Sequence, residues 1–152
     1  MIEQKPAVKT AQTYQLRTAL LSTGRTHRIL AGTRADGHGM NVAIKCYAEG
    51  GENEFHTHAG EDHTFIVLQG RMRFQQPGAP DQILERNGGI LIPAGAFYKF
   101  EAVPGEPLVL ARIGNSAVAF DDRLGVSGAP LPSQSVENKH VDGVPIEGAF
   151  YE

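Results

Sequence analysis

Three histidines lie close together in this sequence and could act as one chemical unit. His56 and His58 are separated by one residue, and His63 follows after a short loop that contains Gly60. Neutral imidazole is the commonest side-chain ligand of divalent transition metals, and three such ligands leave coordination positions open for water or substrate. A His-x-His pair alone is typical of exposed or hydrogen-bonded strand residues, so it is the third histidine that favours a metal site.

The residues around the histidines predict strands that could bring the three rings together. Residues 64–68, TFIVL, are strongly β-prone. Side chains alternate along a strand, so His63, Phe65 and Val67 should share one face. His56 and His58 should share a face for the same reason. If the two segments are adjacent antiparallel strands joined by the loop at 59–62, their imidazoles converge.

The rest of the chain predicts an all-β fold. It has 18 Gly and 9 Pro, a density that favours many short elements and turns. No run has the length and 3.6-residue period of a substantial helix, and residues 13–23 fit a short helix or a strand equally well. Short strands separated by turns predict a sandwich or barrel. The expected strands are 41–47, 54–58, 64–68, 71–75, 82–85, 90–92, 97–103 and 108–113.

A chain of 152 residues suits one domain. We expect a core over residues 27–113, an N-terminal arm over 1–26 and a C-terminal extension over 114–152. The extension is rich in Gly, Pro, Ser and Asp, which also suits a linker-like tail. Ile146, Phe150 and Tyr151 would be poor choices for a free tail, so we favour an arm packed on the barrel or on a partner subunit.

Charge and composition disfavour several classes of protein. The formal charge is −3 with no basic block, so we expect no nucleic-acid partner and no acidic membrane partner. No apolar run approaches the ~20 residues of a membrane span, and residues 1–14 lack a signal-peptide core, so a cytoplasmic location is expected. The single Cys46 excludes an intrachain disulfide and a multi-thiolate zinc site, and is interpreted as a small buried apolar residue.

Two stretches of the sequence resemble the conserved motifs of the cupins. Residues 51–70, GENEFHTHAGEDHTFIVLQG, resemble the first motif, G-x(5)-HxH-x(3,4)-E-x(6)-G, with Gly50 and Gly70 at its two glycine positions. Residues 87–102, NGGILIPAGAFYKFEA, resemble the second, G-x(5)-PxG-x(2)-H-x(3)-N, where Pro93 and Gly95 match. This resemblance implies a double-stranded β-helix, a small jelly-roll barrel.

The sequence departs from the cupin motifs at the metal ligands. Cupin metal sites usually use two His and a Glu from the first motif and a His from the second. Here His63 stands at the Glu position and Tyr98 at the second-motif His position. Glu61 or Asp62 could supply the carboxylate if the loop shifts register. Gly70 argues against that shift, because a one-residue slip turns a side chain to the other face.

The resemblance implies a mononuclear metal-binding cupin that acts on a small organic molecule. His56, His58 and His63 would hold a divalent ion, with Fe, Zn, Ni, Mn and Cu all compatible with three imidazoles. Tyr98 would be a fourth ligand, or would orient the substrate or donate a proton. The loss of the carboxylate leaves the site more positive, which favours an anionic substrate or a water-derived hydroxide.

Several functions remain open at this point. Metal-dependent oxygenation, as in a dioxygenase, is the reaction we place first, while isomerisation, lyase chemistry and hydrolysis are not excluded. The same residues could form a metal-free pocket for acid–base catalysis. The alternative from another class is a non-catalytic small-molecule-binding or sensor cupin. The fold also implies a homodimer.

Cationic side chains on the strands could assist such a site. One cation inside the barrel could clamp a carboxylate, although the sequence does not settle which strand residues face inward. The candidates are Lys45, Arg73, Lys99 and Arg112, with Tyr47 as a further polar group. Four phenylalanines are expected to be core rather than substrate platforms: Phe65, Phe74, Phe97 and Phe100.

Overall fold

The computed structural model describes residues 7–34, 39–51, 54–116, 123–131 and 142–152. These residues form β-strands and connections with no helix, which confirms the all-β prediction. No helix that could span a membrane occurs within these ranges.

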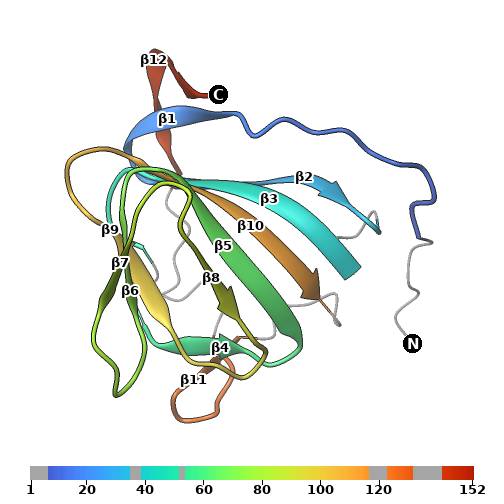
Figure 1. Cartoon of the computed structure of the whole chain (residues 1–152), viewed down its shortest axis with the longest axis vertical. Coiled ribbons are helices and arrows are strands. Elements are labelled where there is room, and N and C mark those ends of the chain that lie inside the picture. The colour runs from blue at the N-terminus through green and yellow to red at the C-terminus, as the bar shows by residue number, and fades with distance from the viewer. Residues whose placement is uncertain (1–6, 35–38, 52–53, 117–122, 132–141) are drawn as a thin grey trace.

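Two antiparallel sheets face each other across the core (Figure 1). The larger sheet has the order β2-β3-β10-β5-β8. Its strands are β2 (Arg25–Gly32), β3 (Gly39–Tyr47), β10 (Leu108–Ser116), β5 (Glu61–Gln69) and β8 (Gly89–Ile92).

The opposing layer is built from shorter strands. It contains β7 (Gln82–Leu84), β6 (Met72–Gln75) and β9 (Lys99–Ala102) in that order, together with the pair β11 (Arg123–Gly125) and β4 (His56–His58). Isolated bridges from His56 to Tyr98 and from Gly51 to Glu101 join the β4 segment to the β9 segment. The two layers form the jelly-roll barrel that the sequence predicts.

A third pair of strands lies outside the barrel. β1 (Thr18–Thr23) pairs with β12 (Val144–Tyr151), so segments near the two ends of the chain lie side by side (Figure 1). The region left undecided at 13–23 is therefore a strand over Thr18–Thr23. The part of the C-terminal extension that is described supplies β11 and β12, while residues 117–122 and 132–141 lie outside the described ranges.

The alternation of side chains along β5 divides the hydrophobic residues into two clusters. Phe65 and Val67 face the barrel interior with Phe74 and Phe100, and all four are buried. The outer face of the larger sheet carries Ile44, Cys46 and Val109, which are covered by Leu21 of β1. Each large buried apolar side chain contributes ~1.5–3 kcal/mol, so the interior cluster holds the two sheets together around the site.

One arrangement differs from the sequence-based prediction. β4 and β5 are consecutive but are not neighbours in a sheet, because β4 pairs with β11 and β5 pairs with β10 and β8. The adjacent antiparallel pair, considered as the arrangement that would bring the imidazoles together, is therefore not formed. The loop between them carries the chain from one layer of the barrel to the other, and the two groups of histidines approach across the interior.

Candidate functional site

The three histidines and Tyr98 meet inside the barrel. The ring centroids of His56 and His58 are 5.4 Å apart, and those of His58 and His63 are 5.0 Å apart. The Tyr98 ring lies 4.5 Å from the His56 ring and 5.5 Å from the His63 ring. His56, His63 and Tyr98 are buried, and His58 is half-buried. The structure therefore brings together all four residues that the motifs single out.

Backbone pairing fixes Tyr98 opposite His56. The His56 N–H donates to the Tyr98 carbonyl at 3.1 Å, and the Tyr98 N–H donates to the His56 carbonyl at 3.0 Å. Side chains directly opposite in an antiparallel pair stand on the same face, so Tyr98 is held beside the first histidine. Gly95 N–H donates to the His58 carbonyl at 3.1 Å and secures the turn before Tyr98.

The His56 imidazole has one satisfied and one unsatisfied nitrogen. Its Nδ1 lies 2.9 Å from the Glu54 carbonyl oxygen, which can only accept, so Nδ1 carries the proton and donates. Nε2 then bears the lone pair, and it is buried with no hydrogen-bond partner. Leaving a buried polar atom unpaired costs ~1–3 kcal/mol. A histidine whose second nitrogen is fixed by a carbonyl is the usual arrangement of a metal ligand.

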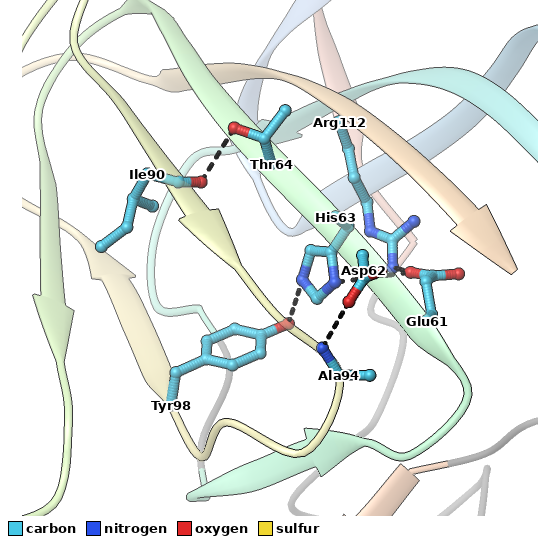
Figure 2. Close-up of polar contacts among 8 residues, drawn as sticks. All are labelled: Glu61, Asp62, His63, Thr64, Ile90, Ala94, Tyr98 and Arg112. Atoms are coloured by element: carbon cyan, nitrogen blue, oxygen red, sulfur yellow. Dashed lines mark hydrogen bonds and ion pairs between the residues drawn. The ribbon is translucent and has the colours of Figure 1, made fainter.

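His63 is a neutral imidazole placed between two polar groups. Its Nε2 lies 3.1 Å from the Tyr98 hydroxyl, and its Nδ1 lies 3.5 Å from a Glu61 carboxylate oxygen without forming a hydrogen bond (Figure 2). Burial, and then the charge of Arg112, are the main causes that lower the pKa of His63 to about 2. The neutral form is the one that binds a metal.

Glu61 is a site residue that the sequence analysis considered as a carboxylate donor and set aside on the register of Gly70. It is buried, forms an ion pair with Arg112, and points toward His63 (Figure 2). The register argument against a carboxylate holds for Asp62, which faces away and accepts a hydrogen bond from the Ala94 N–H at 2.8 Å. It does not hold for Glu61, which is two residues from His63 and therefore on the same face. Strand parity could have identified it.

The strand register also settles which cations face inward. Arg112 and Lys45 are buried within the barrel, and the Lys45 ammonium lies 5.5–5.9 Å from the ring centroids of Tyr47, Phe65 and Phe100. Arg73 instead pairs with Glu101 at 2.6 Å in a half-exposed position. Lys99 lies over the Phe55 ring at 4.8 Å. Of the four candidate cations, Arg112 and Lys45 are therefore the ones that face the interior.

The donor types and ring spacing fit a divalent transition metal. Two imidazoles bound to one ion at ~2 Å have ring centres ~5 Å apart, close to the separations observed here. With the side chains in their present orientations, no group of three or more His, Cys, Asp and Glu residues within the described ranges has its donor atoms placed to bind one metal ion. The hydrogen-bond contact between His63 and Tyr98 is one reason, because Nε2 of His63 is directed at the hydroxyl.

One surface hollow lies apart from the histidines. Its volume is about 580 Å³, and none of the four candidate site residues lines it. It lies where the turn from β5 to β6 approaches the end of β12, with Gly70, Arg71 and Phe150 among its lining residues. Gly70 has φ of 75°, and a Cβ there would lie 2.7 Å from the Pro107 carbonyl oxygen, so this turn requires glycine.

Comparisons with known proteins agree with this architecture. Residues 43–114 match the family model of the cupin domain, a span that contains the three histidines, Tyr98 and Arg112. Comparison with curated proteins finds no match.

Solved structures with the same fold cover most of the described barrel. A cupin-like protein from Thermotoga maritima is 19% identical with a TM-score of 0.54, over 91% of this chain and 92% of that chain. A proposed mannose-6-phosphate isomerase from Ralstonia eutropha is 16% identical with a TM-score of 0.58, over 70% of this chain and 100% of that chain. Recombinant oxalate oxidase in complex with glycolate is 19% identical with a TM-score of 0.53, over 73% of this chain and 62% of that chain. Identities this low show a shared fold alone.

Proposed function

Residues 43–114 of this chain match the cupin domain within a barrel of the cupin fold, and on that premise we propose that the protein is a mononuclear metal-binding protein that acts on a small organic molecule. The observation that supports this most directly is the buried, unpaired Nε2 of His56, whose ring is held by the Glu54 carbonyl beside two further imidazoles. His56, His58 and His63 would hold the ion. Such an ion, when bound, supplies Lewis-acid or redox chemistry and open coordination positions.

The residues around the ligands give the proposed site its character. Tyr98 contacts all three histidine rings, so it would orient a bound molecule or hold a proton at its hydroxyl oxygen. Phe65 and Phe74 pack their rings against Tyr98. We place oxygenation by a metal-dependent dioxygenase first, because three imidazole ligands leave coordination positions on the ion open for a small substrate and a co-reactant. Oxalate oxidase with glycolate is one protein of similar fold that holds a small organic acid.

A non-catalytic small-molecule-binding or sensor cupin is the second candidate. It is favoured by the contact between His63 Nε2 and the Tyr98 hydroxyl, which occupies a donor atom that a metal would need. In this case the histidines and Tyr98 would act as hydrogen-bonding groups for a ligand in a metal-free pocket.

We also propose a homodimer in which β12 takes part. Val144, Ile146 and Phe150 on this strand are between 42% and 53% exposed, and exposed apolar groups on one strand are typical of an association surface. The predicted cytoplasmic location stays a prediction.

Metal analysis tests the proposed function. Protein purified without a histidine tag and reconstituted with Fe, Mn, Ni, Cu or Zn should hold one ion per chain. His56→Ala should lower the affinity at least tenfold, because it removes a buried imidazole nitrogen that has no hydrogen-bond partner. The matched control is His27→Ala, an exposed histidine on β2, which should keep the parent affinity. Equal binding by the parent and His56→Ala would contradict the proposal.

A further inference from the structure

A buried ion pair lies directly behind His63. Glu61 and Arg112 are 7% and 9% exposed, and the carboxylate of Glu61 accepts from the guanidinium of Arg112. Glu61 precedes His63 by two residues on β5, and Arg112 projects from the neighbouring strand β10. Both side chains therefore face the barrel interior beside the same imidazole.

The absence of a side chain at Gly114 makes room for this pair. Gly114 stands opposite His63 in the ladder between β10 and β5. A Cβ at Gly114 would lie 3.2 Å from the Arg112 guanidinium and 3.2 Å from the Glu61 carboxylate, so the pair passes over this backbone position. A larger residue at position 114 would have to displace the carboxylate from its place behind His63.

We propose that the Glu61–Arg112 pair is a positioning device that fixes the tautomer of His63. The carboxylate of Glu61, paired with the Arg112 guanidinium, lies 3.5 Å from Nδ1 of His63 without a hydrogen bond, and its charge favours the proton on this nitrogen. Nε2 then carries the lone pair and accepts from the Tyr98 hydroxyl at 3.1 Å. Arg112 keeps the carboxylate in place, while Glu61 itself stays outside the ligand set.

This inference rests on the proposed function for its purpose, because the fixed tautomer presents the Nε2 lone pair toward the interior where a metal or ligand would bind. Outer carboxylates that orient metal-bound histidines typically change metal affinity by 10- to 100-fold when removed. The pair thus takes a role different from the missing motif carboxylate, which would contact the metal directly.

The tautomer can be measured without any metal. Nitrogen-15 NMR of the chelator-treated protein, at mildly alkaline pH, distinguishes a protonated from an unprotonated ring nitrogen, and His63→Gln assigns the signals. The parent should show His63 protonated at Nδ1. The double variant Glu61→Met/Arg112→Met removes both charges together, so no buried charge is left unpaired. It should shift His63 toward protonation at Nε2, which can donate to the Tyr98 oxygen.

Two further variants keep this test decisive. Gly114→Ala should move the Glu61 carboxylate and so shift the His63 tautomer partly toward protonation at Nε2. This variant replaces the double variant in the test if the double variant does not fold. The matched control is Glu101→Gln, which breaks the half-exposed Arg73–Glu101 pair and should leave the His63 signals unchanged. A parent protonated at Nε2, or folded variants at positions 61, 112 and 114 with parent signals, would overturn the proposal.

Cobalt titration separates this inference from the proposed function. The double variant should bind Co²⁺ 10- to 100-fold more weakly than the parent. Parent-like affinity in a variant whose tautomer has shifted would overturn the positioning role. A parent that binds no transition metal would instead contradict the proposed metal function, and the NMR result would still decide the tautomer.

Discussion

Tyr98 is the residue in contact with every histidine of the site. Its hydroxyl lies 3.1 Å from His63 Nε2, and its ring packs on those of His56 and His58. Tyr98→Phe should lower the free energy of unfolding by ~0.5–1.5 kcal/mol, because one buried hydrogen bond is lost. It should also change the visible spectrum of the Co²⁺-loaded protein, since the hydroxyl would lie at or next to the ion.

The control for this variant is Tyr14→Phe, which removes a hydroxyl from a tyrosine that is 47% exposed. It should leave both the stability and the spectrum at parent values. If Tyr98→Phe also leaves the spectrum and the binding of ligand unchanged, Tyr98 has no part in the site.

Burial of His63 predicts a loss of stability in acid. The pKa of a histidine is 6.5 in the unfolded chain, and burial and the charge of Arg112 lower it to about 2 in the folded protein. Between these values the unfolded chain binds a proton that the folded chain does not. The free energy of unfolding should therefore fall as the pH decreases below 6.5. Urea unfolding of chelator-treated protein at several pH values measures this.

The variant His63→Gln isolates the contribution of this one residue. Gln does not titrate, so the variant should lose less stability than the parent between neutral and acidic pH. His27→Gln, at an exposed position, should follow the parent curve. Identical pH slopes for the parent and His63→Gln would show that His63 does not stay neutral in the folded protein.

For the strands, the alternation of residues in the sequence predicted which side chains share a face, but not which strands pair with each other. The pattern of β5 placed His63 and Phe65 on the same face, and both are buried in the barrel interior. Periodicity does not reveal which sheet a strand joins, and the adjacent pairing of β4 and β5, under which the rings were expected to converge, does not occur. Glu61 was set aside because a one-residue slip of the motif would turn a side chain to the other face. No slip is needed, since Glu61 shares the inner face with His63, but its partner Arg112 lies on β10, which is far from it in the sequence.

The packing of β1 on the outer face of the larger sheet supports the barrel from outside. Leu21 is 2% exposed and contacts the cluster that contains Ile44 and Val109. Leu21→Ala should lower the free energy of unfolding by ~2–5 kcal/mol, because it removes buried apolar surface and leaves a cavity. Leu91→Ala, at a strand position that is 69% exposed, should change it by less than ~0.5 kcal/mol. Equal effects in urea unfolding would contradict the described packing of β1.

At the scale of the molecule, β12 should form part of a dimer contact. Sedimentation should give a mass twice the 16.4 kDa of one chain. Ile146→Glu should shift the protein toward monomer, because it places a charge in the proposed apolar contact. Val126→Glu, at a position 71% exposed in the turn after β11, should leave the mass unchanged. A monomeric parent, or a dimer indifferent to Ile146→Glu, would contradict the proposed contact.

The molecule as a whole brings the rings of three histidines from two layers of one barrel close together in its interior. β4 supplies two rings, β5 supplies the third, and Tyr98 joins them through its backbone pairing with His56. The proposed function requires that these three rings hold one transition metal ion.

A crystal structure of metal-loaded protein, with anomalous scattering measured at the absorption edge of that metal, tests this claim most directly. We expect one anomalous peak per chain inside the barrel, ~2.0–2.2 Å from His56 Nε2 and from nitrogens of His58 and His63. A barrel without a peak at saturating metal, or a peak held by other residues, would contradict the claim.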